Sequence, residues 1–137
     1  MYSLDTVNGI FKGHRVITAR VRAVPLSDLW VSTIVVEELV GKQISHINTL
    51  RSHKKPVGRE CQFLAKLVQS LAAFPLLPYT DEAEDQYRAW TARQKRVGPN
   101  DCRIAAGAIT AGLVVVTCNK KDFSTIPGLA WQDWSQP

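Results

Sequence analysis

The sequence predicts an α/β fold with a central, mostly parallel sheet and helices on both of its faces. Short apolar segments alternate with amphipathic segments from end to end, as in chains that build parallel sheets. Residues 113–117 form an uninterrupted apolar run, typical of a parallel strand covered on both faces. The 137 residues contain no linker, repeat or low-complexity stretch. We therefore expect one domain, residues 1–137.

The first half of the chain contains two strand-like and three helix-like segments. The strand-like segments are short and apolar or β-branched, and the helix-like ones repeat their apolar residues with a period near 3.6. Pro25 closes the first helix, and the polar, basic residues 46–58 extend the second helix or form a loop. In chain order we expect a strand at 2–4, a helix at 8–22, a strand at 29–34, a helix at 35–44 and a helix at 59–74.

In the second half, prolines and glycines divide the elements. Pro75 and Pro78 limit the strand at 76–79 to an edge or irregular role. Thr80 and the acids after it are typical of a helix N-terminus, and Gly112 is typical of a helix C-terminus. In chain order we expect the strand at 76–79, a helix from 80 to about 96, a break at Gly98-Pro99, a helix at 101–111, a strand at 113–117 and a last strand at 129–134.

Four acidic residues lie at the ends of these segments. Asp5 follows the first strand, Glu38 follows the second, and Asp122 follows the strand that ends at Thr117. Asp101 begins the helix before that strand. Because ligands of open α/β sheets bind beyond the carboxyl ends of the strands, we expect at least three of these acids at one edge.

Converging carboxylates repel one another and take up protons unless a cation neutralises them. Carboxylate oxygens without a cysteine–histidine cluster suit a hard cation such as Mg²⁺, with Mn²⁺ as an alternative. The 17 Lys+Arg residues outnumber the 12 Asp+Glu residues, for a net charge of +5. A basic surface around an acidic pocket suits a polyanion, so the pattern indicates metal-assisted hydrolysis of a phosphate ester.

Each acid also has a purely structural interpretation. Asp101 can be a helix N-terminal charge favoured by the dipole, and Asp122 can belong to a turn. Glu38 has Glu37 beside it, and one of the two is a solvated helix residue. The four acids nevertheless occur in a consistent order on an α/β pattern, and this favours a shared metal site over separate structural roles.

Several other function classes lack their signals. The chain has no G-x-S-x-G, P-loop or G-x-G-x-x-G motif. His14, His46 and His53 show no metal-ligand spacing, and the three cysteines are expected to be small buried hydrophobes. No apolar run reaches the roughly 20 residues of a membrane span, and the start resembles no signal peptide. We therefore expect a cytoplasmic protein with no membrane partner.

The residues resemble the PIN-domain family, and more narrowly the VapC-type toxin ribonucleases of type II toxin–antitoxin pairs. The strongest match is VGPNDCRIAAGAITAGLVVVTCNKKDFSTIPGLAWQDW at 97–134. It resembles the family pattern of a glycine, an aspartate, I-A-A on a helix, a strand ending in T-x-N-x-x-D-F, then G-L and a tryptophan. The motifs LDT at 4–6 and VSTIVVEEL at 31–39 fit in order. One departure is Val7, where the family usually reads L-D-T-N.

The resemblance implies a three-layer α/β/α PIN domain that acts as a metal-dependent endoribonuclease. The catalytic acids would be Asp5, Glu38, Asp101 and Asp122. Magnesium would bind Asp5 and Asp101 directly and Asp122 directly or through water, as one ion or two. Glu38 would orient or deprotonate the attacking water. The residues that hold the carboxylates in place would be Thr6, Thr117 and Asn119.

The implied partners are an RNA substrate, a cognate antitoxin and a second copy of the chain in a homodimer. The helix at 59–74 is a candidate partner surface, with core packing as its alternative role. Two other functions stay open at this stage. One is a catalytically weakened PIN-fold module that binds RNA or antitoxin, suggested by Val7, and the other is a housekeeping RNA-processing nuclease.

Overall fold

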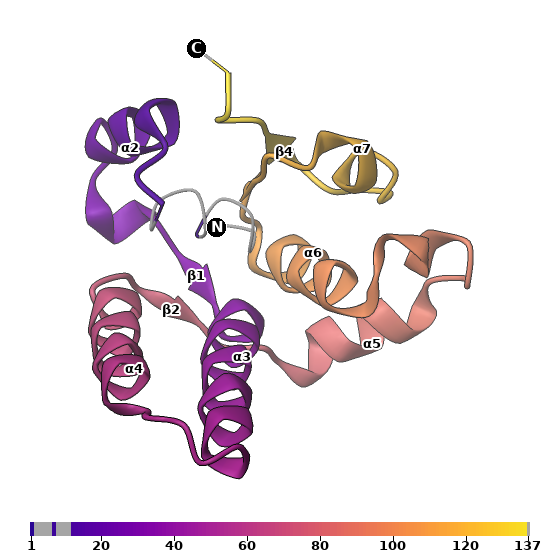
Figure 1. The fold of residues 1–137 in the computed structure, drawn as a ribbon. Helices are drawn as coiled ribbons and strands as arrows, with labels where there is room; N and C mark the ends of the chain where they lie inside the picture. Colours follow the sequence, from indigo (N-terminus) through magenta and orange to yellow (C-terminus); the bar gives the residue numbers. More distant parts are fainter. Residues whose placement is uncertain (2–6, 8–11, 137) are drawn as a thin grey trace.

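The computed structural model describes residues 1, 7 and 12–136 (Figure 1). The expected strand at 2–4, the site residues Asp5 and Thr6, and the first part of the expected helix at 8–22 lie outside the described residues.

All strand pairs of the described residues are parallel. Strand β1 (Val31–Ser32) pairs with β2 (Leu76–Leu77), and β3 (Val115–Val116) pairs with β4 (Trp131–Gln132). The register aligns Val31 with Leu76 and Val115 with Trp131. The parallel arrangement confirms the prediction, but each strand has two residues rather than the four to six expected.

Strand β3 is an interior strand with partners on both edges. On one edge the Met1 nitrogen donates to Val114 O and the Val116 N–H donates to Met1 O, both at 2.7 Å. On the other edge the N–H groups of Val115 and Thr117 donate to the residues of β4 and its approach at 2.9 Å. Val115 is 0% exposed. Val116 and Thr117 are buried as well, whereas Val114 is 38% exposed, so the apolar run marks a strand that is covered on both faces only from Val115 onward.

Six α-helices and two short 3₁₀ helices are present among the described residues. The α-helices are α2 (Arg15–Arg22), α3 (Thr33–Ser52), α4 (Gly58–Ala72), α5 (Asp81–Ala89), α6 (Pro99–Ala111) and α7 (Lys120–Phe123). The 3₁₀ helices are η1 (Leu26–Asp28) and η2 (Gln94–Val97). The short helix α7 was not predicted, because N-K-K-D was interpreted as a turn.

Helix α3 corrects the predicted boundary between strand and helix. The strand expected to reach residue 34 stops at Ser32, whose hydroxyl accepts from the Ile34 N–H at 3.1 Å and caps the helix. The helix then continues to Ser52, well past the expected end at 44, because Ile47 (3% exposed) still packs inward. Helices α3 and α4 form a hairpin that projects from the rest of the fold (Figure 1).

The helices expected at 8–22 and 80–96 are both interrupted. Residues 12–13 form a turn with Gly13 at φ +71°, and α2 begins after it with His14 as its cap. Helix α5 ends at Ala89 because Trp90 turns to extended backbone and is buried at 7% exposure. Helix α6 ends at Ala111 as predicted, before Gly112 with its left-handed φ of +67°, but it begins at Pro99, two residues before the expected start at Asp101.

Helix α6 is the centre of the hydrophobic core. It packs against α3, α5 and η2, and Figure 1 shows it in the middle of the fold. Its inner positions are small or medium-sized and fully buried: Cys102, Ile104, Ala105, Ala106 and Ala108. Small side chains let neighbouring elements approach closely, so a rigid element carries Asp101 at its first turn.

A carboxylate between α5 and α6 links the two helices. Glu84 Oε2 accepts from the Tyr79 hydroxyl at 2.8 Å and from Arg103 Nε at 3.3 Å, and Glu84 Oε1 accepts from Arg88 Nε at 3.2 Å. The Arg103 guanidinium also lies 4.3 Å from the centroid of the Tyr87 ring. These contacts connect α5 to the helix that bears Asp101.

We expect the Glu84 carboxylate to make stability sensitive to acid. The Tyr79 hydrogen bond, followed by the Arg103 and Arg88 cations, lowers the pKa of Glu84 below its ordinary value of 4.5. The folded carboxyl therefore ionises at lower pH than the unfolded one. Its contribution is complete above pH 4.5 and disappears as the pH falls through the lower folded value. Glu84→Gln should flatten the acid limb of a plot of unfolding free energy against pH, measured by urea denaturation. The exposed Glu82→Gln on the same helix should keep the wild-type curve; equal curves for all three proteins would contradict the assignment.

Candidate functional site

The chain turns at the carboxyl end of β3 so that Asp122 is held in one orientation. Thr117 is fully buried, and its Oγ1 accepts from the Asn119 N–H at 3.0 Å. Asn119 directly precedes α7, and its Nδ2 donates to Asp122 Oδ2 at 2.7 Å. The adjacent Phe123 is 0% exposed and anchors the short helix in the core. The T-x-N-x-x-D stretch therefore folds into a supported, half-buried carboxylate beyond an interior strand.

Asp101 lies in the first turn of α6 and is half-buried. Its charge is favoured there by the helix dipole. The neighbouring Cys102 is fully buried, and burial, followed by the Asp101 charge, raises the pKa of its thiol. Cys102 therefore stays a neutral, small hydrophobe, as predicted. Cys61 and Cys118 are only half-buried, so the same prediction is wrong in part for them.

Glu38 lies on the second turn of α3 and pairs within its own helix. Lys42 Nζ lies 3.0 Å from Glu38 Oε1, an i,i+4 contact in which Lys42 is 68% exposed and Glu38 is 20% exposed. Exposed pairs of this kind contribute about 0.3–0.5 kcal/mol. The side chain of Glu38 can therefore leave this pairing at little cost.

The structure brings part of the predicted site together. Thr117, Asn119 and Asp122 form one hydrogen-bonded unit, whereas Asp5 and Thr6 fall outside the described residues. Among positions 1, 7 and 12–136, no three His, Cys, Asp or Glu side chains form a group that could hold a metal ion. The donors that the chain offers here are carboxylate, amide and hydroxyl oxygens, and this chemistry fits a hard divalent cation.

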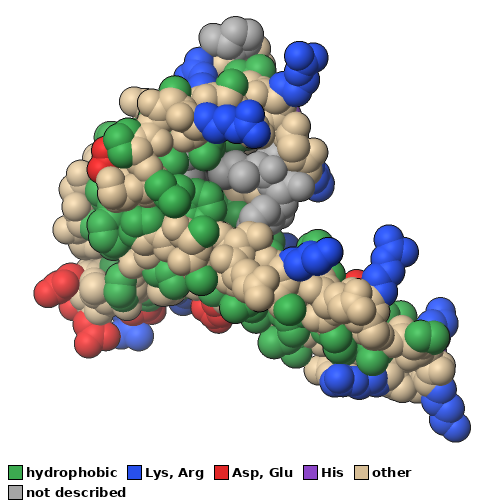
Figure 2. Space-filling view, turned by 90° about the vertical axis from the view of Figure 1, so that its left-hand side faces the viewer, with side chains coloured by type: hydrophobic (Ala, Val, Ile, Leu, Met, Phe, Trp, Pro, Cys, Tyr) green, Lys and Arg blue, Asp and Glu red, His purple; other side chains and the backbone are tan. Residues whose placement is uncertain are grey.

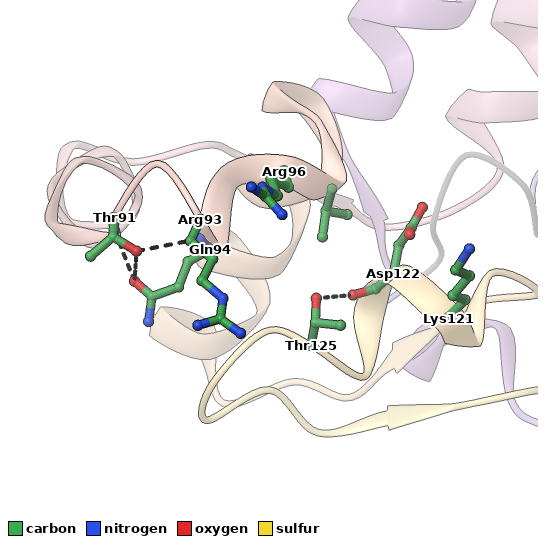
Figure 3. A pocket seen from close by; sticks show the side chains of 8 residues that line it. Thr91, Arg93, Gln94, Arg96, Lys121, Asp122 and Thr125 are labelled. Carbon is green, nitrogen blue, oxygen red and sulfur yellow. Dashed lines mark hydrogen bonds between the residues drawn. The ribbon is translucent and has the colours of Figure 1, made fainter.

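A hollow of about 620 Å³ beside Asp122 was missed by the sequence analysis (Figure 3). One wall is the segment from Thr91 to Val97, and the other is α7 with Thr125. Its lining residues are Thr91, Arg93, Gln94, Arg96, Val97, Lys121, Asp122 and Thr125. In the sequence, Arg93, Arg96 and Lys121 counted only toward the net charge of +5, because the two walls meet in space and not along the chain.

Val7 explains the departure from the L-D-T-N pattern. It is 1% exposed and belongs to the hydrophobic core. A buried asparagine amide would need hydrogen-bond partners to offset the cost of its burial, whereas valine needs none. At this position the chain has therefore exchanged a polar side chain for core packing.

No helix in the described part of the chain combines the length and apolar character needed to cross a membrane. The longest, α3, is broken up by charged and polar residues such as Lys42 and Gln43.

Comparison with known proteins relates this geometry to a family. A model of the PIN domain matches residues 11–129. A protein of Salmonella typhimurium strain LT2 named tRNA(fMet)-specific endonuclease VapC is 40% identical over 75 residues, 52% of this chain and 57% of the relative. A protein of the same name from Shigella flexneri is 49% identical over 51 residues, 36% of this chain and 39% of the relative. These alignments thus span less than two thirds of either relative.

Solved structures extend the similarity to nearly the whole chain. A chain in the crystal structure of DNA-bound VapBC from Salmonella typhimurium is 29% identical, with a TM-score of 0.77 and coverage of 98% of this chain and 96% of the other. A chain of VapBC-1 from nontypeable Haemophilus influenzae shares the fold at 23% identity, with a TM-score of 0.74 and coverage of 99% and 98%. The predicted three-layer PIN fold is confirmed, and the protein belongs to the PIN domain family.

Proposed function

We propose that the protein is a metal-dependent endoribonuclease and the toxin of a toxin–antitoxin pair. The observation that carries this proposal is the Asp122 carboxylate, held by Asn119 at the carboxyl end of an interior parallel strand. The relatives named tRNA(fMet)-specific endonuclease VapC support it. So does the 29% identity to a chain of a VapBC complex over almost the whole length.

The oxygen donors of the site would hold Mg²⁺, or Mn²⁺ in its place. We assign this role to Asp5, Asp101 and Asp122. The chemistry that a bound divalent cation supplies is charge neutralisation at the phosphate and a lower pKa for water. Thr6 would support the first acid, as Asn119 supports Asp122.

The pairing of Met1 supports the inclusion of Asp5. Met1 hydrogen-bonds to the residues on either side of Val115, in the manner of a parallel pair. Asp5 comes four residues after Met1 (5 − 1), and Asn119 comes four residues after Val115 (119 − 115). The chain from Met1 to Asp5 is therefore as long as the chain from Val115 to Asn119, the residue that supports Asp122.

In this proposal Glu38 handles the proton of the attacking water. Its side chain is longer than that of aspartate, it lies on a rigid helix, and its pairing with Lys42 is weak. It would accept the proton as the water oxygen bonds to phosphorus and the bond from phosphorus to the leaving ribose oxygen breaks, and that oxygen would take up a proton from solvent. Asn119 keeps the Asp122 carboxylate aligned during this step.

The direct test is cleavage of RNA, with tRNA(fMet) as the first substrate. Wild-type protein should cleave it in Mg²⁺ or Mn²⁺, EDTA should stop the reaction, and Asp101→Asn should lower the rate by at least about 100-fold. Asp101→Asn keeps the shape of the side chain, so circular dichroism should be unchanged. Activity that survives EDTA, or equal activity of the two proteins, would remove the proposal.

A second candidate is a PIN-fold module that binds its partners without cleaving RNA. The burial of Val7 favours it, because the usual amide is absent there. Calorimetric titration with Mn²⁺ separates the two functions. A nuclease site should bind the cation with an affinity that Asp5→Asn reduces, and the binding module should show no Asp5-dependent binding.

We assign antitoxin binding and homodimer formation to exposed apolar surface, which the projecting α3–α4 hairpin supplies. Ile44, Phe63 and Val68 are 45%, 51% and 47% exposed, whereas Leu67 and Leu71 of α4 are buried. Phe63 and Val68 therefore flank the buried stripe of α4 on its two sides, so that apolar surface continues beyond the core contact. Figure 2 shows hydrophobic side chains beside Lys and Arg on the lower projection, where Figure 1 places this hairpin. A basic and apolar surface suits an acidic, amphipathic antitoxin segment.

A further inference from the structure

The hollow beside Asp122 collects cations from two elements that are distant in sequence. Arg93 and Arg96 come from one wall, and Lys121 comes from α7 on the other, next to Asp122 (Figure 3). Within the described part of the chain, none of these three cations makes a hydrogen bond or ion pair. Two guanidinium groups and an ammonium group against one carboxylate leave an excess of positive charge. A ligand that enters this hollow should therefore be an anion.

The backbone that presents the two arginines is held in place before any ligand arrives. The Thr91 N–H donates to Gln94 Oε1 at 2.8 Å, and the Gln94 N–H donates to Thr91 Oγ1 at 3.3 Å. These reciprocal bonds have the form of a capping box at the start of η2. On the opposite wall, Thr125 Oγ1 donates to Asp122 O at 2.7 Å. Binding therefore requires little ordering of the main chain.

Two further lysines of the same segments do not line the hollow. Lys95, on η2 between the two arginines, places its Nζ 4.6 Å from the centroid of the Tyr87 ring. Lys120, beside Lys121 on α7, has its Nζ 3.2 Å from Asp133 Oδ2. Lys95 and Lys120 therefore interact within the fold, whereas the bases beside them in the sequence line the hollow. The folded chain, and not the sequence order, decides which bases gather there.

We propose that Arg93, Arg96 and Lys121 form a subsite that binds a backbone phosphate of RNA next to the phosphodiester bond that is cleaved. This rests on the proposed nuclease function, because Asp122 belongs both to the hollow and to the catalytic acids. Arginine forks match phosphate oxygens two at a time, and the polar lining of Thr91, Gln94 and Thr125 suits a ribose or a base edge. A phosphate contact positions the strand and carries no sequence information.

The test measures binding and cleavage separately in the full chain. Binding of fluorescein-labelled 12-nucleotide oligouridylate and oligoadenylate is followed by anisotropy in EDTA at several salt concentrations. Arg93→Ala and Arg96→Ala should each weaken binding about tenfold, equally for both oligonucleotides. The slope of log K against log salt should fall by roughly 1 in the double variant. Arg93→Lys and Arg96→Lys should keep the slope and lose part of the affinity, because the charge remains but the fork does not.

Lys95→Ala and Lys120→Ala are the matched controls, since each removes one charge from the same segment. They should bind the oligonucleotides as wild type does. In cleavage assays the arginine variants should raise KM, with kcat within about threefold of wild type, because the lost contact is made equally in ground and transition states. Thermal melts of all variants confirm that the fold is retained.

The outcomes separate this subsite from the nuclease proposal. If wild type binds RNA with this arginine dependence but does not cleave it, the subsite stands and the nuclease function falls. If wild type cleaves RNA and the arginine variants behave like the lysine controls, the subsite is overturned and the nuclease stands. Absence of RNA binding overturns the subsite. So does displacement of the RNA by oligoglutamate as effectively as by unlabelled RNA, with the same arginine dependence, because the hollow would then accept acidic peptide.

Discussion

Asp122→Asn is expected to reduce RNA cleavage by at least about 100-fold while leaving the fold intact. The carboxylate sits beyond an interior strand, is half-buried and is aligned by Asn119 Nδ2 at 2.7 Å. Asparagine has the same shape and can still accept this hydrogen bond, but it lacks the charge that holds a divalent cation. Loss of groups that only support a metal ligand costs 10- to 100-fold, so loss of a ligand should cost more. Initial rates on tRNA(fMet) in Mg²⁺ measure the effect.

The matched control for this prediction is Asp85→Asn. Asp85 is an exposed acid on α5, away from the hollow and from the carboxyl end of β3. The substitution Asp85→Asn makes the same change of charge on the same kind of side chain, and it should leave the rate of RNA cleavage unchanged. Asn119→Ala should fall between the two, because it removes the positioning bond and keeps the carboxylate. A rate for Asp122→Asn within a few-fold of the Asp85→Asn rate would show that Asp122 takes no part in catalysis.

Phe123→Ala is expected to lower the free energy of unfolding by about 3–5 kcal/mol. Phe123 is 0% exposed and among the largest of the fully buried side chains. It holds α7, a helix of only four residues, in the core. Removing the ring leaves a cavity and also frees the element that carries Asp122, so activity should fall with stability. Urea denaturation followed by circular dichroism measures the loss of free energy, and a thermal melt should show a fall in Tm of roughly 10–20 °C.

Phe63→Ala supplies the matched control on the surface. Phe63 is 51% exposed on α4, so the same substitution there should change stability by less than about 0.5 kcal/mol. If Phe63 lies in a partner surface, its loss should instead weaken association with the antitoxin or a second copy. Equal destabilisation by the two substitutions would show that the core does not depend on the anchoring of α7.

The elements predicted well are those whose signal is local. The end of helix α6 was predicted from Gly112, which takes the left-handed conformation there, although Pro99 was interpreted as part of a break and is instead the first helical residue. The break after α5 was missed because Trp90 leaves the helix to bury its ring in the core, and this choice depends on residues elsewhere in the chain. The strands were predicted too long for a related reason. Ser32 satisfies a helix N-terminus instead of extending the ladder.

In the candidate site, too, the locally determined features were predictable and those that depend on long-range contacts were not. The sequence by itself determined the residue types: acids at segment ends, oxygen donors without a thiolate cluster, and Thr117 and Asn119 in fixed spacing before Asp122. Hydrogen bonds within six residues then orient that carboxylate, so local order was enough to foresee it. Only the tertiary structure decided that Arg93, Arg96 and Lys121 line one hollow, and that Lys95 and Lys120 do not. Main-chain packing of η2 against α6 and burial of Phe123 set those positions, and such long-range contacts have no period or spacing that a single chain displays.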